Sequence, residues 1–297
     1  MPCREIDAST LASKIIAVDT PNVIYRHLFQ IRDSTGSPYR NQDGAMIGHL
    51  IGLCNEIAVL YEARLRPIFV FDGETPLLKA ETMRKRSVQA AQRGFRLDSS
   101  MKDQMKRALD ALGVPWVQAP EEAEAQASYM TKRGCWAALT NDYDALLFGA
   151  SCMIRHLSKG RAEVCVLSEA LESLGLDRGR LIDLALLMGT DYNPGGVRGL
   201  GPKRSLQLIR TCSTAKAVLA EIGQNGEMER KLSEIRSYYL DPPVAGSWRS
   251  SWEPPDLAEA QAYLVREMRL SEASVGRLIR VMTCPILPGP RQTKLDC

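Results

Sequence analysis

Short apolar runs alternate with amphipathic stretches through the first half of the chain. The runs are uninterrupted, as expected of strands buried in a parallel sheet, and they lie at 15–18, 67–71 and 136–139. Between them, apolar residues recur at helical spacing in the segments 47–60, 101–112 and 121–132. Pro120 precedes the last of these helices, and Gly113 and Gly134 follow the last two. This alternation predicts an α/β fold with a twisted, mainly parallel sheet flanked by helices.

After about Leu174 the pattern becomes helical throughout. Helices are predicted at about 181–188, 202–210 and 257–268. A glycine-rich segment, 189–201, separates the first two. Residues 240–255 contain four prolines and predict a loop, and the proline-rich tail from Pro285 is expected to be loose. The second half should therefore form an all-helical region.

Composition and cysteine use favour a soluble intracellular protein. Hydrophobic residues make up 45% of the 297 positions and charged residues 25%, and no apolar run is long enough to cross a bilayer. Arg4, Glu5 and Asp7 lie where a signal peptide needs an apolar core. The 8 cysteines include no CxxC pair, and there are only 3 histidines. We therefore expect reduced thiols, with neither a zinc site nor a disulfide framework.

Basic residues gather in one segment of the chain. Between Pro76 and Arg107 lie nine basic and three acidic residues, a balance of +6 (9 minus 3). Since the net charge is +3, the remainder carries −3 (3 minus 6). A basic segment set against an acidic remainder is typical of a protein that holds nucleic acid across an acidic metal site.

Aspartates follow all three predicted strands. Asp19 comes directly after the first, Asp72 after the second, and Asp142 and Asp144 shortly after the third. Ligands of open α/β sheets bind beyond the carboxyl ends of the strands, so these four carboxylates should meet in one crevice. Each aspartate alone has an ordinary alternative as a turn or capping residue, and Asp72-Gly73 is a common turn. Chance explains all three strand ends together poorly.

Three further acids extend this set. Glu122 and Glu124 lie at the start of the third predicted helix, where the helix dipole also favours glutamate, and Asp191 follows a helix, where a turn is the alternative. Packed carboxylates repel one another unless cations neutralise them, and ligand sets made only of oxygen select Mg²⁺ or Mn²⁺. Two such ions about 4 Å apart can bind the attacking and leaving oxygens of a phosphodiester. The set therefore suits metal-dependent phosphodiester hydrolysis.

Six sequence blocks resemble, in their order and spacing, the flap endonucleases, the archaeal and eukaryotic branch of the structure-specific 5′ nucleases. The blocks are Ile16–Asp19, Val70–Gly73, Pro120–Ala125, Thr140–Asp144, Gly189–Tyr192 and Gly196–Ser205. The resemblance covers about Ile15 to Leu295. It implies a 5′-nuclease or PIN-like fold with a C-terminal helix–two-turn–helix DNA-binding region. The implied activity is removal of 5′ flaps in DNA replication and repair, with 5′–3′ exonuclease activity, by two-metal-ion hydrolysis.

The resemblance also implies the residues of the site. Two Mg²⁺ or Mn²⁺ ions are expected to be held by Asp19, Asp72, Glu122, Glu124, Asp142, Asp144 and Asp191. In the family pattern, the catalytic residues Asp72 and Glu124 lie nearest one ion and the TNDYD aspartates nearest the other, while the remaining three act largely through water. Lys79 and Arg86 match basic catalytic residues that steer the scissile phosphate onto the metals. A solvated helix face is the alternative for both.

DNA contacts are implied at three further positions. Tyr25 matches an aromatic residue that stacks on an unpaired base beside the cut, with a half-buried helix tyrosine as the alternative. Arg32 matches a residue near the pocket for a one-nucleotide 3′ flap. Arg84 belongs to the basic segment, which is expected to draw in the single strand.

The glycine-rich turn before Pro202 has a phosphate-binding character of its own. Its glycines let backbone N–H groups approach a phosphate at the start of a helix, and its basic residues add positive charge. The residues concerned are Arg198, Gly199, Gly201, Lys203 and Arg204. The resemblance adds a K⁺ ion bound by carbonyl groups of this turn. An ordinary helix–turn–helix corner is the alternative.

Three features depart from the family pattern. The chain starts with Met1-Pro2-Cys3, which is a short N-terminus for the family. The segment between Asp72 and Glu122 is also short, so we expect a shortened cap rather than a complete two-helix arch. Gln292 and Leu295 belong to a sliding-clamp motif whose two terminal aromatic residues are absent.

These observations divide the chain into expected parts. Nuclease parts are expected at 1–75 and 113–175, a basic helical cap at 76–112, helix–two-turn–helix and C-terminal helices at 176–284, and a flexible tail at 285–297. The expected partners are branched DNA with a 5′ flap and a sliding clamp. The protein is expected to be a monomer in the cytoplasm, near the nucleoid, or in a nucleus. Two other functions stay open: a related nuclease preferring gaps, bubbles, junctions or RNA, and a non-catalytic DNA-junction or clamp-binding module.

Overall fold

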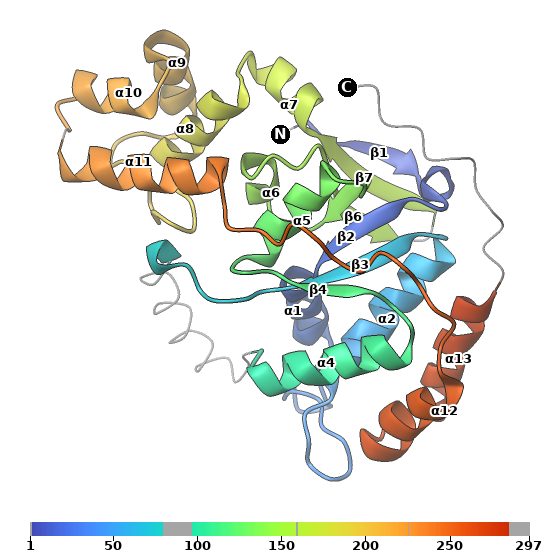
Figure 1. Cartoon of the computed structure of the whole chain (residues 1–297). Coiled ribbons are helices and arrows are strands. Elements are labelled where there is room, and N and C mark those ends of the chain that lie inside the picture. The colour runs from blue at the N-terminus through green and yellow to red at the C-terminus, as the bar shows by residue number, and fades with distance from the viewer. Residues whose placement is uncertain (1, 80–96, 159, 225, 285–297) are drawn as a thin grey trace.

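The fold is built on one seven-stranded sheet (Figure 1). The computed structural model describes residues 2–79, 97–158, 160–224 and 226–284. In spatial order the strands are β1 (Arg4–Asp7), β7 (Arg161–Val166), β6 (Cys152–Ser158), β5 (Ala137–Leu139), β2 (Ile15–Asp19), β3 (Arg66–Phe71) and β4 (Trp116–Gln118). β2 pairs in parallel with β3 and β5, whereas β7 runs antiparallel to both of its neighbours. The predicted α/β class with a mainly parallel sheet is confirmed.

The sequence pattern predicts the three central strands and misses the outer four. β5, β2 and β3 lie side by side in the middle of the sheet, where both faces are covered, so their residues are almost uniformly apolar. β1 is mostly exposed, and β4 is buried only at its middle residue, Val117. β6 and β7 form a hairpin that is partly exposed near its turn. Strands exposed in this way carry no uninterrupted apolar run.

The helices are interspersed with the strands as far as α7, and among the described residues only helices follow after that. They are α1 (Thr20–Gln30), α2 (Gly48–Glu62), α4 (Ser99–Ala111), α5 (Ala123–Thr131), α6 (Asp144–Leu147), α7 (Leu167–Leu174), α8 (Arg178–Met188), α9 (Pro202–Cys212), α10 (Ala215–Glu221), α11 (Glu227–Leu240), α12 (Leu257–Ala260) and α13 (Glu272–Thr283). Short helical turns are η1 (Ala8–Leu11), η2 (Leu77–Lys79) and the π-helical η3 (Gln261–Glu267). The predicted helices correspond to α2, α4, α5, α8, α9 and α12 with η3. Within the described residues, no helix has both the length and the apolar character needed to cross a membrane.

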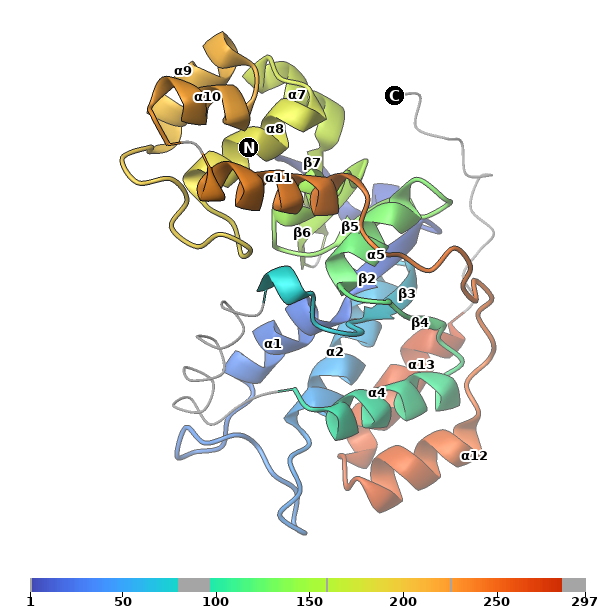
Figure 2. The same ribbon diagram turned by 60° about the vertical axis from the view of Figure 1, so that its left-hand side comes forward.

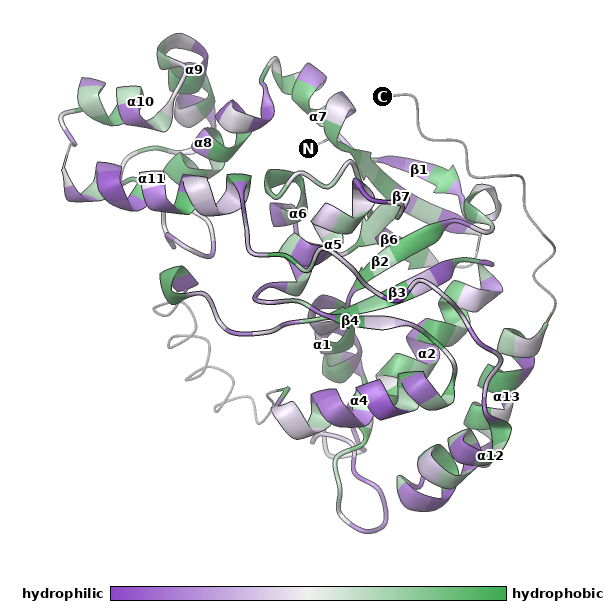
Figure 3. Cartoon of the chain, in the orientation of Figure 1, coloured by the Kyte–Doolittle hydropathy of each residue, from purple (hydrophilic) through white to green (hydrophobic). Residues whose placement is uncertain are grey.

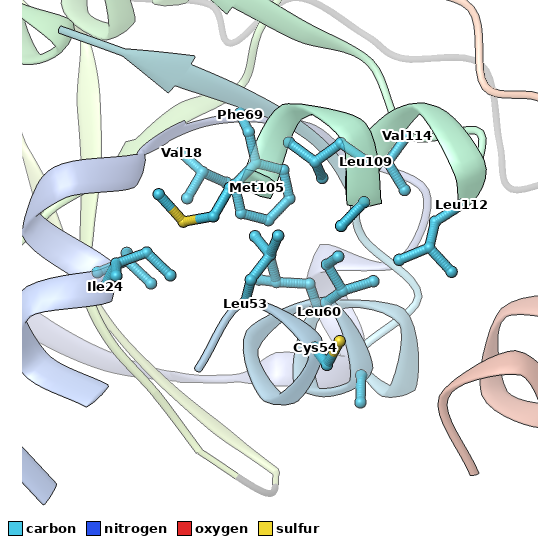
Figure 4. Packing of buried hydrophobic residues seen from close by; sticks show 14 of the residues in the cluster. Val18, Ile24, Leu53, Cys54, Leu60, Phe69, Met105, Leu109, Leu112 and Val114 are labelled. Atoms are coloured by element: carbon cyan, nitrogen blue, oxygen red, sulfur yellow. The ribbon is translucent and has the colours of Figure 1, made fainter. Parts of the chain in front are cut away.

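The sheet separates two apolar layers. Ile16 and Val18 of β2 face one side and Ala17 faces the other, as strand geometry requires. The first side packs against α1, α2 and α4, and α13 packs against α2. Figure 4 shows this layer, in which Phe69 of β3 and Met105 of α4 meet the side chains of α2. The other side packs against α5. In Figure 3 the central strands are mainly hydrophobic, whereas the visible face of α4 carries hydrophilic residues.

Helices α8 to α11 surround a core of their own (Figure 2). Leu187 of α8, Ile209 of α9 and Tyr239 of α11 are all buried in it. Leu147 and Phe148, at the end of α6, belong to the same core. The helical region is therefore packed directly against α6, a short helix at the C-terminal edge of the sheet.

A segment without helix or strand, 241–256, connects α11 to α12 along the α5 side of the sheet. The side chain of Gln126 of α5 accepts a hydrogen bond from the backbone nitrogen of Ala245 (2.6 Å). It also donates one to the backbone carbonyl oxygen of Ala245 (3.2 Å). The indole of Trp252 donates to the carbonyl oxygen of Pro67 (2.9 Å). These bonds hold the segment in place, so that α12, η3 and α13 return to the layer of α2 and α4 (Figures 1 and 2).

The structure corrects the expectation that the thiols are reduced. β1 lies beside β7 with Arg4 opposite Val164, and this pairing brings Cys3 and Cys165 together in a disulfide. The two cysteines are 162 positions apart, so their spacing gives no sign of the bridge. Within the described residues, the other cysteines are Cys54, Cys135, Cys152, Cys212 and Cys284, and they are free thiols.

Candidate metal centre and catalytic site

Two carboxylates lie where β2 and β3 end. Asp19 is the last residue of β2, and its oxygens accept hydrogen bonds from the backbone nitrogen of Asn22 (3.3 Å) and the hydroxyl of Thr140 (3.0 Å). Asp72 directly follows β3, and its Oδ1 accepts a bond from the backbone nitrogen of Ala123 (2.9 Å). Both carboxylates therefore lie at the C-terminal edge of the sheet, where ligands of such folds bind.

The turn after Asp72 brings the start of α5, with its two glutamates, to the same edge of the sheet. The backbone nitrogen of Gly73 donates to the carbonyl oxygen of Glu121 (2.6 Å). A Cβ atom on Gly73 would lie 2.2 Å from the carbonyl oxygens of both Ala119 and Pro120, so only glycine permits this approach. The contact fixes the start of α5, which carries Glu122 as its N-cap and Glu124 in its first turn. Burial raises the pKa of Glu122, and the charge of Asp72 adds to the rise, whereas Lys79 opposes it.

Glu124, Asp142 and Asp144 form the tightest group of carboxylates. One oxygen of each lies within 4.8 Å of the others. Asp144 begins α6, and its backbone nitrogen donates to Oδ1 of Asp142 (3.1 Å). Oε1 of Glu124 is buried without a hydrogen-bond partner in the described part of the chain. A buried carboxylate oxygen in that situation fits a cation, and a donor set of oxygens alone fits a hard divalent one.

Burial and mutual repulsion disfavour the ionised forms of these groups. Burial, together with the charge of Asp72, raises the pKa of Asp19 to about 7. Burial, together with the charge of Asp142, raises the pKa of Asp144 to about 7. Burial also raises the pKa of Glu124 well above its usual value, and the two neighbouring aspartates add to the shift. A bound divalent ion has the opposite effect, because it favours the charged carboxylates.

Lys79 lies among the remaining carboxylates. Its Nζ is 2.9 Å from each carboxylate oxygen of Glu122 and 3.5 Å from Oδ2 of Asp191. Burial alone would lower the pKa of Lys79, but the charge of Glu122 and the hydrogen bond to it outweigh burial, so the pKa is raised. The same Nζ lies 5.3 Å from the ring centroid of Tyr192. The structure thus brings Lys79, Glu122 and Asp191 together.

The expected DNA contacts lie on α1 and before α9. Tyr25 of α1 packs against the core, and its hydroxyl accepts a hydrogen bond from the backbone nitrogen of Leu97 (3.4 Å). Arg32 lies just after α1 and forms an isolated backbone bridge with Pro38. The turn between α8 and α9 is exposed at Arg198, Gly199, Gly201, Lys203 and Arg204. The expected site residues outside the described residues are Arg84, Arg86, Gln292 and Leu295.

Sequence reasoning missed two side chains that contact the carboxylates. The hydroxyl of Thr140 donates to Asp19 and accepts from the backbone nitrogen of Asp142 (3.2 Å). Its place directly before Asn141-Asp142 was a weak signal. The hydroxyl of Tyr239 donates to Oδ2 of Asp144 at 2.6 Å. Tyr239 is 95 positions away from Asp144, and no local pattern predicts that contact.

Comparisons with known proteins agree with this geometry. The chain matches the family models described as the XPG N-terminal domain, over residues 2–93, and the XPG I-region, over residues 113–191. Flap endonuclease 1 of Staphylothermus marinus is 36% identical over 298 residues, covering 88% of this chain and 85% of the relative. Flap endonuclease 1 of Pyrococcus horikoshii is 34% identical over 333 residues, covering 100% of this chain and 95% of the relative.

Solved structures show the same relationship. The flap endonuclease-1 from Methanococcus jannaschii superposes with a TM-score of 0.80 at 35% identity, covering 95% of this chain and 96% of that one. The catalytic core of Rad2 in complex with DNA substrate superposes with a TM-score of 0.75 at 25% identity, covering 94% and 96%. The strand-end carboxylates thus belong to a fold that these nucleases share. The chain is a nuclease, and it belongs to the flap endonuclease family.

Proposed function

We propose that this chain hydrolyses a phosphodiester bond at the base of 5′ flaps in branched DNA, and that it also degrades DNA from a 5′ end. The observation that carries the proposal is the convergence of carboxylates from three strand ends and α5, including the buried, unpartnered Oε1 of Glu124 among the described residues. The two relatives named above, which are flap endonucleases, support the substrate. Removal of flaps would serve DNA replication and repair.

Seven carboxylates are proposed to hold two Mg²⁺ or Mn²⁺ ions. Asp72, Glu124, Asp142 and Asp144 are proposed as direct ligands, and Asp19, Glu122 and Asp191 as residues that act through water. Two such ions stabilise the charge on the attacking and leaving oxygens of a phosphodiester. The raised pKa values of Asp19, Glu124 and Asp144 support this role, because a cation is what would keep these groups ionised together.

Lys79 is proposed to position the scissile phosphate, with Arg86 as its companion. The ammonium group of Lys79 is buried beside Glu122 and Asp191, and its raised pKa keeps it charged. A fixed positive charge next to the carboxylates stabilises a phosphate as negative charge builds on it. This is a catalytic contribution distinct from general attraction of DNA.

The turn before α9 is proposed to bind the backbone of duplex DNA. A Cβ atom on Gly199 or Gly201 would meet nothing within 4 Å, so the backbone there is open to a phosphate. Exposed Arg198, Lys203 and Arg204 surround it with positive charge. We also propose that carbonyl groups of this turn bind K⁺. Rad2, whose catalytic core was solved in complex with DNA substrate, supports a DNA ligand for this fold.

The remaining assignments concern the other parts of the chain. We propose that Tyr25 stacks on an unpaired base, that Arg32 lies near a 3′ flap, and that Arg84 guides the single strand. Residues 1–75 and 113–175 are proposed as the nuclease parts, 76–112 as a shortened cap, and 176–284 as the helical DNA-binding part. The tail 285–297, with Gln292 and Leu295, is proposed to contact a sliding clamp. We propose that the protein acts as a monomer in the cytoplasm, near the nucleoid, or in a nucleus.

A matched panel of DNA substrates tests the activity. Flap, gap, bubble and four-way-junction DNAs, and an RNA-containing flap, are compared in Mg²⁺ and in EDTA. We expect the 5′ flap to be cut fastest in Mg²⁺ and no substrate to be cut in EDTA. Preference for gaps, bubbles or junctions would instead identify a related nuclease. Tight flap binding without cleavage in Mg²⁺ or Mn²⁺ would identify a non-catalytic binding module.

A further inference from the structure

A side chain of the helical region reaches into the carboxylate site. Tyr239 is the penultimate residue of α11, and its hydroxyl donates to Oδ2 of Asp144 at 2.6 Å. This is the short distance expected when an O–H group donates to a carboxylate. The tyrosine has 0% of its surface exposed, so water does not compete for the bond.

The position of Tyr239 is fixed at both its ring and its backbone. The ring centroid lies 4.8 Å from that of Phe148, directly after α6. Arg178, at the start of α8, donates through Nε to the carbonyl oxygen of Leu147 (2.9 Å) and through Nη2 to that of Tyr239 (2.6 Å). Leu147 ends the helix that Asp144 begins. The two ends of α6 are therefore joined to the same residue of α11, one directly and one through Arg178.

We propose that Tyr239 is a positioning residue that holds Asp144 for metal binding. The carboxylate group of aspartate rotates within a broad range unless a partner fixes it. The hydrogen bond holds Oδ2, and the orientation of Asp144 relative to Glu124 and Asp142 is thereby set. This inference rests on the metal centre of the proposed function. Hydrogen-bond partners of ligating carboxylates contribute about 10-fold to 100-fold to metal affinity or activity.

The proposal links the helical region to the metal centre. Tyr239 belongs to the core formed by α8 to α11, and the turn before α9, the proposed duplex-binding turn, lies in the same region. The orientation of a metal ligand thus depends on how this region packs against α6. Metal affinity should accordingly fall when the bond from α11 is removed, even though every carboxylate is still present.

The test compares Tyr239→Phe with the matched control Tyr263→Phe. Tyr263 is also buried, and its hydroxyl also donates one hydrogen bond, to the carbonyl oxygen of Gln104 (3.0 Å). It lies, however, in the core between the sheet and the helices α2 and α4. Mn²⁺ binding to the DNA-free protein is measured by calorimetry, and the Mg²⁺ dependence of single-turnover flap cleavage is measured in parallel. Tyr239→Phe should raise the Mn²⁺ dissociation constant and the half-saturating Mg²⁺ concentration about tenfold. Saturating Mg²⁺ should restore most of the rate.

The control variant should lower the melting temperature to a similar extent and leave both metal values unchanged. Unchanged Mn²⁺ binding in folded Tyr239→Phe would overturn the proposal, as would an equal loss of metal affinity in Tyr263→Phe. Asp144→Asn separates this failure from that of the metal centre. If Asp144→Asn weakens Mn²⁺ binding and Tyr239→Phe does not, only the positioning role is wrong. If neither variant changes Mn²⁺ binding, the metal centre itself is wrong.

Discussion

Replacing Asp144 with asparagine should stabilise the protein when divalent ions are removed. Burial and the charge of Asp142 raise the pKa of Asp144 from 3.8 to about 7. A difference of about 3 pH units corresponds to about 4 kcal/mol of destabilisation when the group is ionised in the folded protein. The hydrogen bond from Tyr239 favours the ionised carboxylate, and its effect is already contained in the raised pKa. Because asparagine carries no charge, the gain in the free energy of unfolding should be about 4 kcal/mol.

The size of this effect changes with pH in a defined way. Below pH 3.8, the ordinary pKa of an aspartate, the carboxyl of Asp144 is protonated in both the folded and the unfolded protein, and it causes no difference in stability. From there to about pH 7, it is ionised only in the unfolded protein, so the wild type loses stability as the pH rises. Above pH 7 the deficit stays constant. The advantage of Asp144→Asn should thus grow from pH 4 to pH 7 and then level off.

Urea denaturation in EDTA between pH 4 and pH 8.5 measures this difference. Asp43→Asn is the control, because the Asp43 side chain is 63% exposed and pairs with Arg269 at the surface, so its removal should not stabilise the protein in EDTA. Addition of Mn²⁺ should reverse the order of stability, since only the wild type binds the ion well. Asp144→Asn proving less stable than the wild type at pH 8 in EDTA would refute the reasoning.

Three further changes have defined outcomes. Lys79→Ala should lower single-turnover cleavage by about 10²-fold or more, with little change in DNA affinity; a loss confined to affinity would make it an ordinary phosphate contact. Lys203→Glu should weaken duplex binding and reduce the salt slope by about 1 or more, as seen in filter binding across salt concentrations, and an unchanged slope would contradict a duplex-binding turn. Cys3→Ser should lower the free energy of unfolding by up to about 5 kcal/mol, because the bridge closes a loop of 162 positions. If dithiothreitol leaves the wild-type unfolding midpoint unchanged, the bridge has no such effect.

The fold could be predicted where burial is uniform. β2, β3 and β5 are covered on both faces, so their sequences are apolar throughout, and the helices between them bury one continuous stripe. β6 and β7 were not predicted, because their partly exposed residues interrupt the run of apolar residues. The disulfide between Cys3 and Cys165 depends on the pairing of β1 with β7, which is a property of the folded sheet rather than of any segment.

The site could be predicted to the extent that local sequence determines it. Asp19 and Asp72 are placed by the strands they follow, and Gly73 fixes the start of α5 and its glutamates. Their convergence follows from parallel strands alone. The bond between Tyr239 and Asp144 arises differently, because it depends on how a whole helical core packs against α6. Such contacts depend on tertiary structure, and the spacing of residues along the sequence does not predict them.

The two sides of the acidic site are neutralised in different ways. Lys79 forms ion pairs with Glu122 and Asp191, so a positive charge of the protein itself neutralises these two carboxylates. Within the described residues, no lysine or arginine forms an ion pair with the group around Glu124, and burial raises the pKa of Glu124 well above its usual value and that of Asp144 to about 7. We therefore expect a divalent ion mainly at Glu124, Asp142 and Asp144. The last of these accepts the hydrogen bond from Tyr239. This division would let Lys79 exchange a carboxylate for a phosphate while Glu124, Asp142 and Asp144 stay compensated by metal.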